Sequence, residues 1–211
     1  MRILFQGDSI TDAIRSREND NYLGQGYPAL VKSHFCFEEP NQYEFFNRGV
    51  GGNRIVDLYA RLKADIINLK PDIMSILIGV NDVWHEFDFE QKPNGVDAGK
   101  YFKIYSMLLD EVLEALPNIK IMIMEPFTLE GSGNEAYYKE FKKEVTKRAE
   151  KAKAIAEKYN LPFIPLQEKF DEAARCAPNS NWLIDGVHPT EAGHELIKRE
   201  WIRYFKTINK N

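Results

Sequence analysis

The sequence predicts a three-layer α/β/α domain built around a parallel β-sheet. Short β-type runs alternate with helical stretches along the chain, a pattern typical of parallel strands joined by right-handed crossovers. One run, "IMSILIG", is apolar almost throughout, as in a strand that is covered on both faces. The 211 residues, 44% of them hydrophobic, suffice for one core. We therefore expect a single domain over residues 1–211.

Five segments have the composition of β-strands. Each is short, rich in apolar, aromatic or β-branched residues, and separated from the next by a stretch of another periodicity. In order along the chain they are Arg2–Gln6, Tyr43–Asn47, Ile73–Ile78, Lys120–Met124 and Pro162–Leu166.

The stretches between these runs place apolar residues at helical intervals. Leu58 and Leu62, for example, recur one turn apart after Ile55. The Lys- and Glu-rich stretch "KEFKKEVTKRAEKAKAIAEK" is typical of a helix with one face in solvent. The predicted helices are Tyr27–Phe37, Ile55–Leu69, Tyr101–Leu116, Glu135–Tyr159 and Glu191–Phe205.

Polar residues follow three of these strands and precede the last helix. In open parallel sheets, ligands bind outside the carboxyl ends of the strands. The first strand is followed by Gly7-Asp8-Ser9, the second by "NRGVGGN" and the third by "GVNDVW". The loop before the last helix reads "DGVHPT". These four loops are therefore the candidates for a functional site.

Together the four loops supply the groups that acyl transfer needs. That reaction requires a nucleophile, a base oriented by an acid, and donors for the developing oxyanion. Ser9 could attack a carbonyl, His188 could accept its proton, and Asp185 could orient the imidazole. Asn81 carries an amide donor, and glycines after the second strand allow close approach of backbone N–H groups.

Each loop also has a purely structural interpretation. Ser9 could cap a helix, and the glycines could form a tight turn. Asn81-Asp82 could form a turn stabilised by its own side chains, and Asp185 and His188 could be an ordinary solvated pair. Taken together the loops favour catalysis, because four separate segments would otherwise have to match the pattern by chance.

Other classes of function fit the sequence poorly. The charges nearly balance at a net −4, whereas nucleic-acid binders concentrate positive charge. No apolar run approaches the roughly 18 residues of a membrane span. The stretch "GVGGNR" lacks the third glycine of a dinucleotide motif and no G-K-[ST] occurs, so we expect no cofactor. His194-Glu195 is not completed to H-E-x-x-H, because Lys198 stands there, so we expect no metal.

The ordered motifs resemble those of the SGNH hydrolases, the GDSL-type esterases. "GDSIT", "NRGVGGN", "GVND" and "DGVHPT" match the four blocks of that family from residue 7 to residue 190. The resemblance implies a flavodoxin-like sandwich with a five-stranded parallel sheet in the order 2-1-3-4-5. It also implies a catalytic triad of Ser9, Asp185 and His188. The implied oxyanion donors are the N–H of Ser9, the N–H of Gly52 and the Asn81 amide, with Gly51 as the alternative to Gly52.

Three further stretches look like the intracellular acetylxylan esterases of that family. They are "GVNDVWHEFD", "EPFTLEG" and "NWLIDGVHP". This similarity implies removal of acetyl groups from xylo-oligosaccharides, with a small-molecule ester as the partner. Asp8, Trp84 and Trp182 are then candidate substrate contacts, although packing beneath loops explains the tryptophans equally well.

A lysophospholipase or thioesterase is the main alternative, and a non-catalytic binding module is a remote one. The stretch "FDFEQKPNGVDAGKYF" is too polar for the apolar lid of a lipase. Met1-Arg2 leads straight into the first strand, and a cleaved leader would remove Ser9, so we expect a cytoplasmic protein. The sequence leaves open whether the chain forms a homo-oligomer.

Overall fold

The central sheet has five parallel strands in the order β2-β1-β3-β4-β5 in a computed structural model that describes residues 1–87 and 93–209. The predicted parallel sheet and its strand order are confirmed. Part of the segment considered as a lid, residues 88–92, lies outside the described residues. The strands are β1 (Arg2–Gly7), β2 (Glu44–Asn47), β3 (Ile73–Leu77), β4 (Lys120–Met124) and β5 (Phe163–Ile164).

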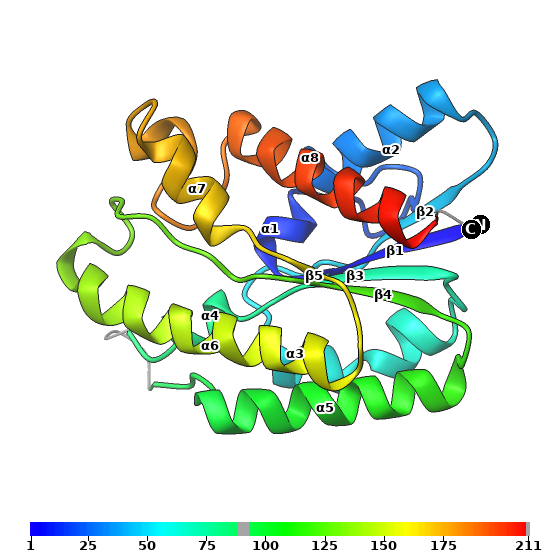
Figure 1. Cartoon of the computed structure of the whole chain (residues 1–211), viewed down its shortest axis with the longest axis horizontal. Helices are drawn as coiled ribbons and strands as arrows, with labels where there is room; N and C mark the ends of the chain where they lie inside the picture. Colours follow the sequence, from blue (N-terminus) through cyan, green and yellow to red (C-terminus); the bar gives the residue numbers. More distant parts are fainter. Residues whose placement is uncertain (88–92, 210–211) are drawn as a thin grey trace.

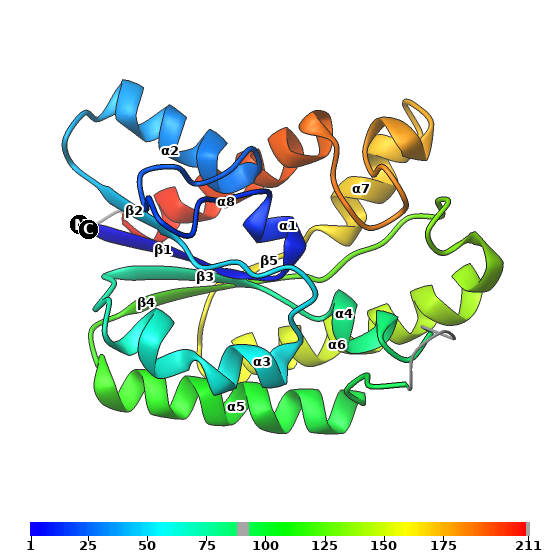
Figure 2. The same cartoon turned by 180° about the vertical axis from the view of Figure 1, so that it is seen from behind.

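Helices cover both faces of the sheet, as Figures 1 and 2 show from opposite sides. One face carries α1 (Ser9–Asp12), α2 (Tyr27–Glu38), α7 (Gln167–Ala174) and α8 (Glu191–Ile208). The other carries α3 (Ile55–Ala60), α4 (Val80–Trp84), α5 (Ala98–Ala115) and α6 (Tyr138–Lys158). Short 3₁₀ turns occur at Glu135–Tyr137 and Asn179–Asn181.

Alternation along β1 divides the core into two layers. Phe5 points toward α2 and α8, where its ring packs 5.3 Å from that of Trp201. Leu4 points to the opposite face and joins the cluster of Ile55 and Tyr105. All of these side chains are fully buried. Successive strand side chains face opposite sides of a sheet, so a central strand covered by two helical layers must be apolar throughout.

The predicted helix Ile55–Leu69 is wrong in its second half. The α-helix ends at Ala60, and a π-helical turn follows at Lys63–Ile67. Arg61 stands at the break, and its guanidinium donates to the backbone oxygens of Arg48 and Gly7. These contacts with distant segments compete with regular helix geometry, which an apolar spacing cannot reveal.

The sequence also missed α1, α4 and α7, because four to eight residues are too few to establish a period. Two of them follow the strands that carry the motifs. Gly7 of β1 pairs in register with Leu77 of β3, so α1 and α4 begin side by side at one edge of the sheet. Within the described ranges, no helix has the length and apolar character needed to cross a membrane.

Candidate active site

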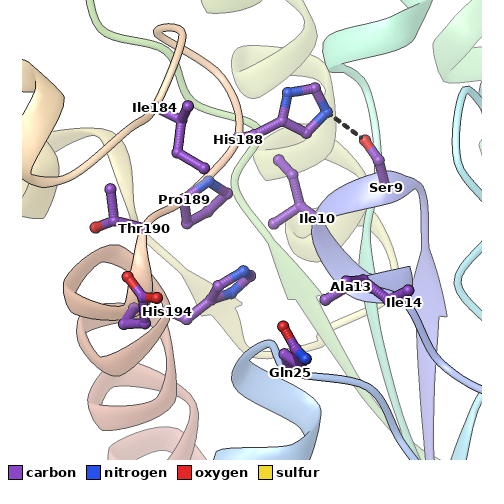
Figure 3. A pocket seen from close by; sticks show the side chains of 11 residues that line it. Ser9, Ile10, Ala13, Ile14, Gln25, Ile184, His188, Pro189, Thr190 and His194 are labelled. Carbon is purple, nitrogen blue, oxygen red and sulfur yellow. Dashed lines mark hydrogen bonds between the residues drawn. The ribbon is translucent and has the colours of Figure 1, made fainter.

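Ser9 lies at the sharp turn from β1 into α1. Asp8 is the N-cap of this helix, and its Oδ1 accepts a hydrogen bond from the Ile10 N–H at 3.0 Å. The Ser9 hydroxyl is therefore not used as a cap and lies 2.9 Å from Nε2 of His188 (Figure 3). A Cβ on Gly7 would stand 2.4 Å from the Leu77 carbonyl oxygen, so the turn requires glycine there.

His188 and Asp185 are joined within one loop. Nδ1 of His188 lies 2.7 Å from Oδ2 of Asp185. The other carboxylate oxygen accepts the backbone N–H groups of Val187 and His188 at 2.9 and 2.8 Å. These bonds fold the loop around the carboxylate and fix the orientation of the imidazole. Thr190 then caps α8 by accepting the Gly193 N–H, and Pro189 before it favours an extended backbone ahead of the helix.

The electrostatics of this pair suit a general base. Burial raises the pKa of Asp185, but hydrogen bonds from the His188 ring and from two backbone N–H groups outweigh it and lower the pKa to about 2. The same bond to Asp185 raises the pKa of His188, against the opposing effect of burial. Asp185 therefore stays ionised at neutral pH and stabilises an imidazolium on His188 when a proton arrives.

The glycine turn after β2 distinguishes between the two candidate oxyanion donors. The N–H of Gly51 donates to Oδ2 of Asp12 at 3.1 Å and is therefore already engaged. Gly52 has φ +78°, a conformation that favours glycine, and its N–H has no acceptor among the residues described. A Cβ on Gly51 would lie 3.9 Å from that of Ser9, so this turn lies next to the serine. The arrangement favours Gly52 as the donor.

Asn81 reaches the same place from α4. Its side-chain Nδ2 donates to the carbonyl oxygen of Asn53 at 3.2 Å. An amide nitrogen carries two hydrogens, so this bond fixes the side chain and leaves a second N–H for an oxyanion. Register between β1 and β3 thus brings the Ser9 and Asn81 segments together, as expected.

Two buried residues, Asn47 and Asp82, hold these loops in place; the sequence indicated no role for Asn47 and only a local turn for Asp82. Oδ1 of Asn47 accepts the Gly49 N–H at 2.8 Å, while its Nδ2 donates to the Thr11 oxygen at 2.6 Å. Both carboxylate oxygens of Asp82 lie within 3.2 Å of the Ile55 N–H. Burial raises the pKa of Asp82 to about 7. Both side chains belong to the quoted motifs, but their partners lie at distant positions in the sequence.

Two of the expected substrate contacts need correction. Asp8 is only 1% exposed, so it supports the turn instead of reaching a substrate. Burial raises its pKa to about 7, although the Ile10 N–H opposes this shift. Trp182 lines a separate hollow with Leu196 and Arg199, not the space beside Ser9. Trp84 does lie at the site, with its ring centre 5.8 Å from that of His188.

A pocket of about 310 Å³ opens beside Ser9 and His188. Side chains from α1, from the start of α8 and from the loop that carries the histidine surround it (Figure 3). Ile10 and Pro189 contribute apolar wall, and Gln25 and His194 contribute polar groups. The site therefore combines a serine hydroxyl aligned with a histidine and adjoining space for a ligand.

Comparison with known proteins shows the family of this chain. The model of the GDSL-like lipase/acylhydrolase family matches residues 5–196. An acetylxylan esterase from Geobacillus stearothermophilus is 34% identical over 209 residues, which cover 96% of this chain and 92% of the esterase.

Solved structures show the same similarity. A crystal structure of that esterase superposes with a TM-score of 0.85 at 34% identity, covering 96% of this chain and 92% of the other. A candidate GDSL-like lipase from Parabacteroides merdae gives a TM-score of 0.87 at 34% identity, covering 96% and 94%.

Proposed function

The chain belongs to the GDSL-like lipase/acylhydrolase family and is a carboxylic ester hydrolase, and from this premise we propose that it acts through an acyl-enzyme on Ser9. The observation that carries the proposal is the continuous chain from Asp185 through His188 to Ser9, with contacts of 2.7 and 2.9 Å. A nucleophile, a base and an orienting acid in this order are the requirements of the mechanism.

In the first half-reaction, Oγ of Ser9 attacks the carbonyl carbon and its proton moves to Nε2 of His188. The carbonyl oxygen becomes an oxyanion that accepts hydrogen bonds from the N–H of Ser9, the N–H of Gly52 and the Asn81 amide. When the bond to the alcohol oxygen breaks, His188 donates its proton to that oxygen. The alcohol leaves, and the acyl group remains on Ser9.

In the second half-reaction, water attacks the acyl carbon while His188 accepts one of its protons. The tetrahedral species collapses, the bond to Ser9 breaks, and His188 returns the proton to Oγ. The carboxylic acid departs and the site is regenerated. Asp185 stabilises the imidazolium in both halves without itself taking the proton.

We further propose that the preferred substrates are acetyl esters of carbohydrates, with acetylated xylo-oligosaccharides as the leading class. Two features support this choice. The relative with 34% identity over nearly the whole chain is an acetylxylan esterase. The Trp84 ring packs against His188 and, through Phe141, against α6, so a large rigid side chain stands close to the reacting atoms. A short acyl group fits such a boundary better than a long one.

A hydrolysis panel tests both the preference for a short acyl group and the preference for a carbohydrate ester. It compares 4-nitrophenyl acetate with the octanoate, and acetylated xylo-oligosaccharides with lysophospholipid and an acyl-CoA. We expect acetate to exceed octanoate in kcat/KM, and the oligosaccharide to exceed both other natural classes. Faster cleavage of octanoate and lysophospholipid would favour a lipid acylhydrolase instead.

The nucleophile is tested separately with a serine-directed phosphonate. Mass spectrometry should find one adduct, on Ser9, with loss of activity in step with labelling. The matched control is Ser9→Ala, which should take up no label. Labelling of a different serine would refute the assignment.

A further inference from the structure

The pocket beside Ser9 has apolar rims and a polar floor. Ile14 and Ile184 flank it and are 72% and 65% exposed, which is unusual for large aliphatic side chains. Figure 3 shows the His194 ring projecting into the pocket between Ile10 and Gln25. The volume of the pocket, about 310 Å³, is at the lower end of the range for ligand pockets, which is roughly 300–1,000 Å³. One ring-sized group is therefore the natural occupant.

The position of the pocket indicates which part of an ester it receives. Ser9 and His188 line it, but Gly52 and Asn81 do not. The carbonyl oxygen must point toward those two donors, away from the pocket. The oxygen of the leaving alcohol must lie near Nε2 of His188, because it takes its proton from there. The alcohol part of the ester therefore lies on the side of His188 that faces the pocket.

His194 presents a defined hydrogen-bond donor at this place. Its Nδ1 accepts the backbone N–H of Tyr27 at 3.1 Å, which assigns the ring hydrogen to Nε2. Burial lowers the pKa of His194 to about 4, against a smaller opposing effect of Glu191, so the ring is neutral at physiological pH. Among the described residues, Nε2 has no hydrogen-bond partner. Because Nδ1 is occupied by the Tyr27 N–H, Nε2 is the ring nitrogen that can bond a ligand in the pocket.

We propose that this pocket binds the alcohol part of the ester and that the Nε2–H of His194 donates a hydrogen bond to an oxygen of that alcohol. The matching ligand class is a sugar, whose ring or hydroxyl oxygen meets His194 while its C–H groups pack against Ile14 and Ile184. His194 is then a specificity residue for the alcohol. The inference rests on the proposed acyl-enzyme at Ser9, because that reaction orients the ester.

Two matched variants separate the roles of the two ring nitrogens. In His194→Asn the side-chain oxygen stays near the position of Nδ1 and can still accept the Tyr27 N–H, but the second donor is lost. In His194→Gln an N–H group returns near the position of Nε2. The substrates are an acetylated methyl xyloside and ethyl acetate, whose alcohol has no second oxygen.

The readout is the ratio of kcat/KM for the xyloside to that for ethyl acetate. A neutral hydrogen bond is worth a factor of roughly 3 to 10, so His194→Asn should lower this ratio by that amount and His194→Gln should restore part of it. An unchanged ratio in His194→Asn would overturn the proposal. Absence of ester hydrolysis in the wild type would instead contradict the proposed function.

A binding measurement tests the inference without turnover. Methyl xyloside, the product alcohol, is titrated into Ser9→Ala while the histidine ring nitrogens are followed by long-range ¹H–¹⁵N NMR. We expect the free protein to show His194 as the neutral Nε2–H tautomer and the sugar to shift that Nε2 signal. A xyloside that leaves the Nε2 signal in place at tens of millimolar would overturn the proposal.

Discussion

The neutral, buried His194 should make the folded protein less stable in acid, and replacing His194 should remove this loss of stability. The pKa of His194 is about 4 in the folded protein, against 6.5 for an unperturbed histidine. A lowered pKa means that the unfolded chain binds the proton more readily. The stability that His194 contributes is therefore present above pH 6.5 and is lost as the pH falls toward 4.

The size of this loss follows from the two pKa values. At pH 4.5 the ring is protonated about 100:1 in the unfolded chain but only about 1:3 in the folded one. The free energy of unfolding should therefore fall by roughly 2–3 kcal/mol between pH 7.5 and pH 4.5 through this one group. The side chain is only 8% exposed, so solvent screens the effect little.

Urea unfolding of the wild type and of His194→Asn at both pH values measures this contribution. Asp8 and Asp82 also titrate in this range, but with raised pKa values of about 7, so they act in the opposite direction. They are present in both proteins and cancel in the comparison. We expect the wild type to lose roughly 2–3 kcal/mol more than the variant on acidification. Equal losses would refute the buried neutral state of His194.

Three further changes test the reacting groups. Asn81→Ala should lower kcat by roughly 100- to 1000-fold with little change in KM, because an oxyanion donor acts in the transition state; a change in KM alone would mean that Asn81 only binds substrate. Asp185→Asn should move the acid limb of the pH–kcat/KM profile to lower pH, because Asp185 raises the pKa of His188 and His188 must be neutral to accept a proton; an unmoved limb would assign the base elsewhere. Asp12→Ala frees the Gly51 N–H and should lower kcat by disturbing the turn at Gly52. Circular dichroism is the control for folding. Full activity would show that the bond from Gly51 to Asp12 does not matter for catalysis.

Much of the site could be predicted from local sequence because its parts lie at the ends of strands. The apolar run Ile73–Leu77 and the alternation of strands and helices specify a parallel sheet, and such a sheet brings its carboxyl ends together. Ser9 and Asn81 therefore meet whatever the detailed packing. Asp185 and His188 stand three residues apart, so their bond is local as well.

Local sequence could not distinguish Gly51 from Gly52 as the candidate oxyanion donor. Both glycines suit a turn, and nothing in "NRGVGGN" distinguishes their N–H groups. The distinction comes from Asp12, which lies 39 positions earlier and occupies the Gly51 N–H. In the same way, the sequence allowed Ser9 to cap a helix, but the folded turn shows that Asp8 is the N-cap and that the Ser9 hydroxyl contacts His188.

Local sequence specifies the sheet, the order of the candidate loops and the residue types in them, because periodicity, turns and strand ends are properties of neighbouring residues. The positions of the remaining side chains depend on how the layers pack. Trp182 lines a hollow that does not include Ser9, whereas His194, which the sequence presents only as half of a zinc motif, lines the pocket beside Ser9. Hydrogen bonds and burial join residues that are distant along the chain, and a partner such as Tyr27 for His194, 167 positions away, exists only once the layers have packed.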